Sequence, residues 1–345
     1  MKFLFYISKK YSIPIIQPIV KYLRKTDYIF SLFVSKKVAT HIPEELKDLR
    51  IFTNVENAIK FNPDFILCPG NFIDFRIPGI KVQLFHGLGI EKKSHYKIRH
   101  FFDVYCTSGP FVTKQFNKLQ EKYKYFLVQE TGWAKVDHIL NYNAKNFREN
   151  FRIPQNKKVI LFAPTHSQKM QSAEDLLPII PRIIRNDEFW MIKFHEIMSK
   201  QIIQMVRDKN IKIIQDYDIT PYLHAADILI SDTSSVIYEF MLLNKPIITY
   251  RTKSKKNKGI NILKPEELRD AIDRSFRNPT EFEKNHREHI QAINPYCDGK
   301  ISENIIQTLI NIKNNNELPD KRKPLNLFRK MQIIYHSKYK KGYLR

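Results

Sequence analysis

The chain has 345 residues, of which 43% are hydrophobic and 27% are charged, and this balance excludes a mostly disordered protein. Its length predicts two domains, each large enough to bury its own core. The formal net charge of +23 favours an anionic partner, and composition alone leaves nucleic acid, an anionic lipid surface and a phosphorylated substrate open.

Cysteine usage and the N-terminal segment bear on the cellular compartment. Cys68, Cys106 and Cys297 are widely spaced and form no CxxC pair, so neither a disulfide framework nor a zinc site is expected, and a reducing cytosol fits best. The first 17 residues are interrupted by Lys9 and Lys10 and lack a small-residue cleavage site, which predicts no signal peptide. The sequence has no uncharged apolar run of about 18 residues, so no membrane-spanning helix is expected.

The first half of the chain alternates short apolar runs with polar stretches of helical character. Several runs are almost entirely apolar, which is typical of strands in a parallel sheet covered on both faces. The predicted strands are KFLFYIS (2–8), DYIFSLFVS (27–35), DFILCPG (64–70), KVQLFHG (81–87) and DVYCTSG (103–109).

A polar stretch at 141–156 predicts the linker, and a second series of strands and helices follows it. Its predicted strands are KKVILFAPTHS (157–167), FWMIKFHE (189–196), IKIIQDY (211–217), ADILISD (226–232) and KPIITYR (245–251), and its helical segments include 175–186 and 199–209. We therefore predict an α/β protein with two Rossmann-like domains, residues 1–145 and 146–312, facing each other across a cleft.

The remaining segment, 313–345, is predicted to be a basic tail. Residues 321–345 contain many Lys and Arg residues and no Asp or Glu. Leu327, Met331 and Ile334 fall near one face of a predicted helix whose other faces are basic. This pattern indicates an amphipathic helix that lies on a membrane surface. The alternative is a solvated, partly disordered tail.

Four polar motifs follow predicted strands, where ligands bind in folds of this kind. If the two domains face each other, all four point into one cleft. The motifs are His86-Gly87, Pro164 to Ser167, His195, and Asp232 to Ser235.

The motif at 232–235, Asp-Thr-Ser-Ser, precedes a predicted helix. A helix N-terminus offers free N–H donors and partial positive charge, and short hydroxyl side chains add donors, so the motif suits a phosphate. The alternative is that one Ser or Thr caps the helix while Asp232 ends the strand. One helical turn later, Glu239 is a candidate for a ribose hydroxyl, although a solvated helix residue is the simpler reading.

The two strand-end histidines are candidates for catalysis. Gly87 and Gly89 beside His86 allow the backbone close approach to a ligand, and a neutral imidazole there can accept a proton from an attacking hydroxyl. His195, with Lys193 nearby, can stabilise a phosphoryl oxygen. A structural role remains the alternative for each histidine taken alone.

Several familiar motifs are absent from the sequence, namely GxxxxGK[ST], HExxH, GxSxG and GxGxxG. Their absence counts against P-loop hydrolysis, zinc proteolysis, serine hydrolysis and dinucleotide oxidoreduction. No acidic cluster or other strong metal site is predicted, and the need for a divalent ion stays open.

These features occur in an order that resembles the CDP-glycerol glycerophosphotransferase family, which includes teichoic-acid primases and polymerases and related capsule enzymes. The resemblance covers roughly residues 80–310 and is most specific at 222–250. The matching features are His86-Gly87, G-x-x-K-x-D (Gly132, Lys135, Asp137), Ala163 to Thr165, His195, YLHAADILISDTSSVIYEFMLLNKPIITY and Cys297 to Lys300.

The resemblance implies a GT-B-like fold and transfer of glycerol phosphate, or a related polyol phosphate, from a CDP-linked donor to an acceptor hydroxyl with release of CMP. It implies that His86 is the general base and that His195 contacts the transferred phosphate. The residues expected at the donor's phosphates and nucleotide are Thr165, Asp232, Thr233, Ser234, Ser235 and Glu239, with Gly87, Lys135, Asp137 and Lys193 as further candidates. CDP-glycerol is the expected donor, and no cofactor is assigned.

Some positions depart from the family pattern. The family commonly has Trp before the first His, Pro after the second, Tyr between Asp and the serines, and an aromatic residue and Arg after the APT stretch. Here these positions hold Phe85, Glu196, Thr233, and His166 with Ser167. The donor alcohol therefore stays open among glycerol, ribitol, another polyol and a nucleotide sugar.

Acceptors in this family are carried on polyprenyl lipids at the inner face of the membrane, which implies a lipid-linked or polyol-phosphate acceptor. We expect a cytoplasmic enzyme whose basic tail holds it peripherally on that anionic surface. The competing readings are a GT-B glycosyltransferase or a sugar 2-epimerase, although epimerases usually carry glycines after the Ser/Asp pair. A nucleic-acid-binding protein is disfavoured because no recognised module is present.

Overall fold

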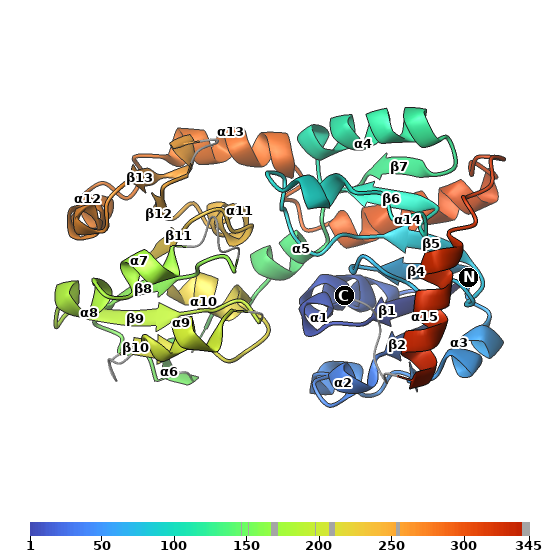
Figure 1. The fold of residues 1–345 in the computed structure, drawn as a ribbon, viewed down its shortest axis with the longest axis horizontal. Helices are drawn as coiled ribbons and strands as arrows, with labels where there is room; N and C mark the ends of the chain where they lie inside the picture. The colour runs from blue at the N-terminus through green and yellow to red at the C-terminus, as the bar shows by residue number, and fades with distance from the viewer. Residues whose placement is uncertain are drawn as a thin grey trace. The chain divides into compact units, whose positions relative to one another are not determined.

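The computed structural model describes residues 1–339 except 146, 151, 167–171, 197, 207–210 and 253–255. Ser167 and residues 340–345 of the predicted tail therefore lie outside the described residues. The chain forms two compact units (Figure 1). The first comprises 1–86, 93–138 and the described residues from 292 onward, and the second comprises 87–92 and 139–291.

The first unit contains a seven-stranded parallel sheet in the order β3-β2-β1-β4-β5-β6-β7. Its strands are almost fully buried near the centre of the sheet, as expected for nearly continuous apolar runs covered on both faces. They are β1 (Lys2–Ile7), β2 (Ile29–Val34), β3 (Ile51–Phe52), β4 (Phe65–Cys68), β5 (Ile80–Gln83), β6 (Val104–Thr107) and β7 (Leu127–Glu130).

Helices cover this sheet, and α14, which comes late in the chain, returns to it. α14 packs against α1, and Gln307 Nε2 donates to Tyr22 Oη at 3.0 Å. The helices of the unit are α1 (Ile13–Leu23), α2 (Lys36–Ala39), α3 (Val55–Phe61), α4 (Pro110–Tyr123), α14 (Ile301–Asn314) and α15 (Leu327–Tyr339), with single-turn helices at Lys10–Ser12, Glu44–Leu46 and Lys93–Tyr96.

The second unit contains a six-stranded parallel sheet in the order β10-β9-β8-β11-β12-β13. Its strands are β8 (Lys158–Phe162), β9 (Glu188–Ile192), β10 (Ile211–Ile213), β11 (Ile228–Ser231), β12 (Ile247–Tyr250) and β13 (Ile260–Ile262). Its helices are α6 (Phe147–Asn150), α7 (Ala173–Leu176), α8 (Ile180–Ile183), α9 (Lys200–Gln204), α10 (Thr220–Ala225), α11 (Val236–Met241) and α12 (Leu268–Arg277), with single turns at Lys256–Lys258 and Pro265–Glu267.

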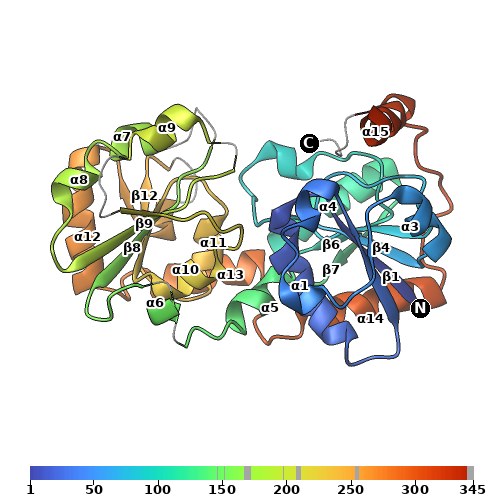
Figure 2. The same cartoon turned by 90° about the horizontal axis from the view of Figure 1, so that it is seen from below.

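Two further helices, α5 (Lys135–Leu140) and α13 (Glu283–Ile293), each cross a boundary between the units. Within the second unit, alternate residues of the strands point into one hydrophobic core. Ile160, Trp190 and Ile230 pack with α7, α8, α9 and α12 on one face of the sheet. Figure 2 shows α7 and α9 on one side of this sheet and α10 on the opposite side.

The structure bears out the α/β prediction and contains every strand predicted from the sequence. The strands that the sequence did not reveal, β3, β7 and β13, all lie at sheet edges. Edge strands are short and partly exposed, so they lack the continuous apolar run that marks a central strand.

The compact units and the predicted domains divide the chain at different residues. Residues 292–312 lie with the first unit rather than the second, because α14 buries Ile305, Ile306 and Leu309 there. The segments 87–92 and 139–145, both inside the predicted first domain, lie with the second unit.

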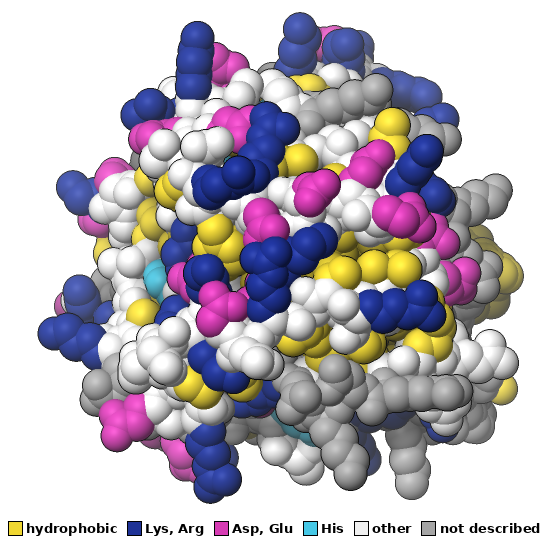
Figure 3. All heavy atoms as spheres, turned by 90° about the vertical axis from the view of Figure 1, so that its left-hand side faces the viewer, with side chains coloured by type: hydrophobic (Ala, Val, Ile, Leu, Met, Phe, Trp, Pro, Cys, Tyr) yellow, Lys and Arg dark blue, Asp and Glu magenta, His cyan; other side chains and the backbone are white. Residues whose placement is uncertain are grey.

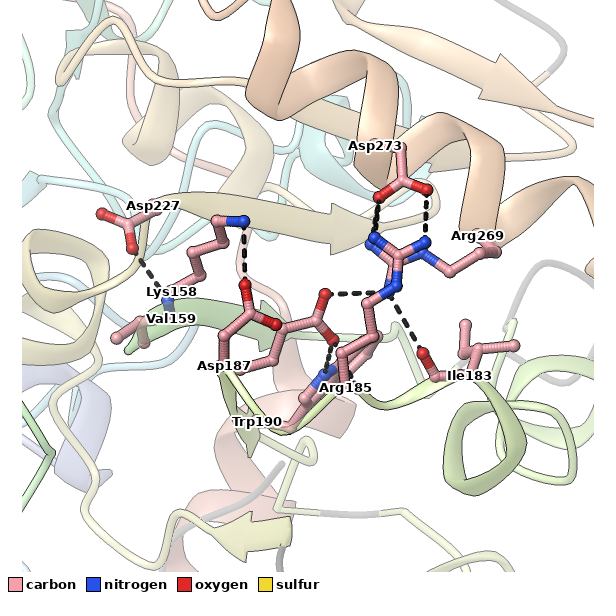
Figure 4. A network of polar contacts seen from close by, with 10 residues as sticks. Lys158, Val159, Ile183, Arg185, Asp187, Trp190, Asp227, Arg269 and Asp273 are labelled. Carbon is pink, nitrogen blue, oxygen red and sulfur yellow. Dashed lines mark hydrogen bonds and ion pairs between the residues drawn. The ribbon is translucent and has the colours of Figure 1, made fainter. Parts of the chain in front are cut away.

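Charge is mixed on the surface of the second unit. Figure 3 shows Lys and Arg side chains interspersed with Asp and Glu. The amino-terminal edge of its sheet carries a network of paired charges (Figure 4), in which Arg269 contacts the buried Glu188 at 2.8 Å and Arg185 contacts Asp273 at 2.7 Å. These pairs join α12 to the sheet and have an evident structural role.

Candidate functional site

The polar motifs of the second unit meet at the carboxyl edge of its sheet. β9, β8 and β11 are adjacent, and the strand order reverses direction between β8 and β11. The backbone N–H of Ala163 donates to Ile230 at 2.9 Å, and that of Lys193 donates to Phe162 at 2.9 Å, so the three strand ends stay in register. Such a switch point is where open α/β sheets bind ligands. The structure thus brings together the segments that carry Thr165, His195 and Asp232.

Asp232 organises this edge from inside. It is fully buried, and its carboxylate accepts hydrogen bonds from the backbone N–H groups of Thr165, Ser172 and Thr233 and from the Ser172 hydroxyl, at 2.6–3.1 Å. Burial raises the pKa of Asp232, and these hydrogen bonds oppose that shift. Because its oxygens are already engaged, Asp232 positions the loops around the site rather than presenting a free group to a ligand.

The hydroxyls that follow Asp232 are less engaged. Thr233 Oγ1 is buried and has no hydrogen-bond partner among the described residues. Ser235 is the N-cap residue of α11, yet its side chain makes no capping hydrogen bond. The Ser235 side chain therefore does not cap α11, although such a cap was the alternative explanation of this motif. Ser234 and Ser235 are both half-buried.

Two histidines lie side by side at this edge. The ring centroids of His166 and His195 are 4.1 Å apart, with an interplanar angle of 42°. His195 is exposed, whereas His166 Nδ1 is buried and, within the described part of the chain, has no hydrogen-bond partner. Burial lowers the pKa of His166, and nearby Lys92 lowers it further. From the sequence, His166 belongs to the strand-end motif Pro164 to Ser167 and departs from the family pattern, but it is not among the residues predicted to bind the donor.

Lys193 and Glu239 were also candidates from the sequence. Lys193 is half-buried just after β9, two residues before His195. Glu239 in α11 is only 5% exposed. The expectation that Glu239 is a solvated helix residue is therefore wrong, because the face of α11 that carries it is covered.

The segment 87–92 crosses this region and was not recognised from the sequence as part of it. At Gly87 a Cβ would lie 3.1 Å from Ser235 Oγ, so glycine allows the close approach. Glu91 accepts a hydrogen bond from Tyr238 at 2.6 Å and pairs with Lys258 at 2.7 Å. Next to it, Lys92 Nζ reaches Thr165 Oγ1 at 3.5 Å.

His86 lies at the carboxyl edge of the first unit's sheet. Its side chain is exposed, and its ring centroid is 5.1 Å from that of Tyr11. Phe85, immediately before it, has a φ of +59°, an uncommon conformation for a bulky residue, and its carbonyl accepts a hydrogen bond from Trp133 Nε1 at 3.3 Å. This strained turn fixes the direction in which His86 leaves the strand. Its placement against the residues of the second unit stays a prediction.

Beside His86, His95 packs among aromatic rings. Its ring centroid is 4.9 Å from that of Phe85. Burial lowers the pKa of His95 to about 3, and proximity to His86 contributes. His95 is therefore neutral at physiological pH.

The G-x-x-K-x-D segment has a structural role in the first unit. Gly132 has a φ of +87°, and a Cβ there would lie 2.8 Å from Ile301. Lys135 is buried with Nζ 5.8 Å from the Trp133 ring, and the buried Asp137 carboxylate accepts hydrogen bonds from the first turn of α14. The segment therefore attaches α14 to its unit.

The described residues show neither a metal-binding cluster nor a membrane-spanning helix. No group of three or more His, Cys, Asp or Glu side chains in this part of the chain is arranged to hold a metal ion. None of the described helices combines the length and apolar character that crossing a bilayer requires.

Comparisons with known proteins place the chain in a family. The model of the CDP-glycerol:poly(glycerophosphate) glycerophosphotransferase family matches residues 87–311. The teichoic acid glycerol-phosphate primase of Bacillus subtilis (strain 168) is 27% identical over 266 residues, covering 67% of this chain and 68% of that protein.

Solved structures share the fold at low sequence identity. The wall teichoic acid polymerase TagF superposes with a TM-score of 0.66 at 16% identity, covering 91% of this chain and 89% of that chain. UDP-GlcNAc 2-epimerase from Neisseria meningitidis gives a TM-score of 0.60 at 16% identity, covering 90% and 100%. These likenesses confirm the predicted GT-B-like fold. Because the family model spans well over half of its length, this chain belongs to the CDP-glycerol:poly(glycerophosphate) glycerophosphotransferase family of transferases.

Proposed function

We propose that the enzyme transfers glycerol phosphate from CDP-glycerol to a hydroxyl of a lipid-linked or polymer acceptor in the synthesis of a teichoic-acid-like or capsule polymer. The observation that carries this proposal is the set of polar groups at the β8–β11 switch point, within the segment that matches the family. Thr165 and the 233–235 hydroxyls lie there on loops that Asp232 fixes from inside, and His195 follows the adjacent strand β9 with its ring 4.1 Å from that of His166. Hydroxyl and imidazole groups on fixed loops suit a diphosphate.

The reaction is a displacement at phosphorus. The acceptor hydroxyl forms a new O–P bond to the glycerol-bearing phosphorus as the bond from that phosphorus to the oxygen of CMP breaks. His86 accepts the hydroxyl proton, a role that an imidazole commonly fills in enzymes. His195 donates a hydrogen bond to the transferred phosphoryl group, and CMP leaves with the bonding electrons.

Thr165 and Thr233 to Ser235 hold the donor's phosphates in this proposal. Thr165 is 2% exposed, and its N–H is held by Asp232 at 3.0 Å, so the residue is fixed before a ligand arrives. Groups fixed in this way cost little reorganisation during the reaction. Glu239, the candidate for a ribose hydroxyl, is assigned a positioning role instead, because its side chain on α11 is only 5% exposed.

The epimerase and glycosyltransferase alternatives have weaker support. The solved structure of UDP-GlcNAc 2-epimerase from Neisseria meningitidis resembles this chain at 16% identity, a level that speaks for the fold alone. Among sequence relatives, the primase at 27% identity over 266 residues favours glycerophosphotransfer. Ribitol phosphate remains the alternative donor group.

We further propose that the tail holds the enzyme on an anionic membrane surface from the cytoplasmic side. α15 is a described helix fixed to the first unit, where Lys323 pairs with Asp103 at 2.6 Å and Arg329 lies 5.8 Å from the Phe72 ring. Apolar side chains of α15 and of the residues just before it nevertheless project into solvent. Those with the largest exposed fractions in this segment are Leu325 (70%), Phe328 (69%), Leu327 (61%) and Met331 (61%). Exposed apolar groups beside basic ones complement an anionic bilayer surface.

The test of the reaction is acceptor-dependent release of CMP from CDP-glycerol by the purified protein. CDP-ribitol and UDP-sugars are measured in parallel, with a lipid-linked or glycerol-phosphate acceptor. CMP release from one CDP-polyol would establish phosphotransfer and identify the donor. Release of UDP from a sugar donor, with neither CDP-polyol active, would contradict the proposal.

A further inference from the structure

Lys92 lies at the carboxyl edge of the second unit's sheet without a matching carboxylate. Its Nζ is 3.5 Å from Thr165 Oγ1, and it forms no ion pair with any described residue. Asp232 attracts it through space, but the oxygens of Asp232 already accept hydrogen bonds from three backbone N–H groups and one hydroxyl. The ammonium group is therefore available to an incoming anion.

The opposite edge of the same sheet shows a different arrangement. There Lys158 pairs with Asp187 at 2.9 Å, and Arg185 and Arg269 pair with acidic partners. Cations at that edge stabilise the fold by pairing, whereas Lys92 is half-buried and unpaired among the described side chains. Burying part of a cation without a partner has a cost, and burial does lower the pKa of Lys92. A ligand anion would offset that cost.

A buried anchor holds Lys92 in this place. The neighbouring Glu91 accepts hydrogen bonds from Tyr238 at 2.6 Å and from Lys258 at 2.7 Å. Lys258 is only 1% exposed, and its carbonyl accepts a hydrogen bond from His286 at 2.9 Å. Leu88 and Ile90 are also buried. These contacts fix the segment 87–92 at the sheet edge, and they fix the backbone of Lys92 with it.

A second basic group faces the same place. His166 follows β8 directly after Thr165, the residue that Lys92 contacts, and its Nδ1 is buried without a hydrogen-bond partner among the described residues. Lys92 is close enough to perturb it electrostatically. A buried, unsatisfied ring nitrogen is costly unless a ligand completes it.

Resting on the proposed function, we infer that Lys92 and His166 bind the donor's diphosphate and that Glu91 and Lys258 position Lys92 for this contact. Lys92 contributes positive charge near the phosphate that leaves with CMP. His166 contributes one ring N–H as a donor. Both come from segments that flank the residues already proposed, so the diphosphate site extends from the hydroxyls after β11 across Thr165 to the segment 87–92.

The test is calorimetric binding of inorganic pyrophosphate and of CDP-glycerol to the full chain and its variants. Lys92→Met should weaken both by about tenfold or more, as expected for loss of a charge-assisted contact, and should flatten the dependence of Kd on salt. Lys92→Arg should retain most of the binding. Lys93→Met removes the same charge from the adjacent exposed position and should change neither Kd by more than about twofold.

His166→Asn should weaken pyrophosphate binding by a smaller factor, about threefold to tenfold. Lys258→Met should weaken pyrophosphate binding, whereas Lys258→Arg, which can still pair with Glu91, should bind pyrophosphate as the wild type does. If Lys258 had only a structural role far from the site, pyrophosphate binding would be unchanged in both variants. Unchanged binding by Lys92→Met, with CMP release intact in the wild type, would overturn the role of Lys92 and leave the proposed function standing.

Other outcomes separate the two proposals further. If the protein binds pyrophosphate through Lys92 but does not bind CDP-glycerol, the inferred anion site is supported and the proposed donor is contradicted. Binding of neither ligand by the wild-type protein would overturn the inference.

Discussion

Asp137 and Ser302 are joined by two hydrogen bonds, since one carboxylate oxygen of Asp137 accepts from both the backbone N–H and the hydroxyl of Ser302 at 2.7 Å. The other oxygen accepts from the N–H of Ile301 at 3.3 Å. Asp137 thus satisfies free donors in the first turn of α14, although 165 residues separate it from Ser302. This contact explains why the last helix of the second predicted domain instead completes the first unit.

Asp137→Ala should lower the free energy of unfolding by about 2 kcal/mol, because it removes a buried cap and leaves N–H groups unsatisfied. Denaturant unfolding followed by circular dichroism would measure this. Asp137→Asn should lose less, since its amide oxygen can still accept. Glu303→Ala changes an exposed acidic residue in the same turn and should cost no more than about 0.5 kcal/mol. Equal losses in Asp137→Ala and Glu303→Ala would show that the buried cap contributes nothing special.

His86→Ala should reduce turnover by about 10²–10⁴-fold while leaving the affinity for CDP-glycerol nearly unchanged, as expected when a general base is removed. Single-turnover CMP release and calorimetric binding would separate the two effects. His41→Ala, at an exposed histidine of the same unit, is the control and should retain full turnover. If His86→Ala keeps its rate, another group accepts the proton.

Lowering the pH should destabilise the fold through His95. Its folded-state pKa of about 3 lies below the ordinary value of 6.5, so between these values the unfolded state binds a proton that the folded state does not. Stability therefore rises with pH across this window and is lost as pH falls below about 6.5. At pH 5 the loss from this residue should be about 1–2 kcal/mol relative to pH 7.

His95→Phe tests this effect because it keeps an aromatic ring beside Phe85 and removes the titrating group. Urea unfolding of both proteins at pH 5 and pH 7 gives the difference. The variant should lose about 1–2 kcal/mol less than the wild type over this interval. Parallel losses in the two proteins would mean that His95 is not the group responsible.

The central strands and the strand-end motifs could be predicted from the sequence because both depend on local pattern. An apolar run such as residues 228–231 predicts a buried strand, and parallel strands place their following residues at one edge. This reasoning brought Thr165, His195 and Asp232 together correctly. The roles of Asp232 and Asp137 as internal acceptors depend on partners distant in the chain, and no local pattern encodes them.

The segment 87–92 escaped prediction for the same reason. Gly87 and Gly89 suggested close approach to a ligand, but nothing in the neighbouring residues indicated that Glu91 pairs with Lys258, 167 residues later. Lys92 then looked like one of many lysines in a basic chain. The only local signal was its position a few residues after His86.

The tail prediction distinguishes apolar insertion from simple charge attraction. Phe328→Ser with Met331→Ser removes two side chains that are 69% and 61% exposed, so the fold should keep its stability while binding to vesicles containing anionic lipid weakens by about tenfold or more. Leu263→Ser, at a residue of the second unit that is 58% exposed, is the matched control and should bind as the wild type does. Flotation with vesicles of increasing anionic lipid content would measure the affinity.

Because basic residues also contribute, binding should fall with salt in every variant. Undiminished binding by the double variant would show that the exposed face of α15 does not enter the membrane.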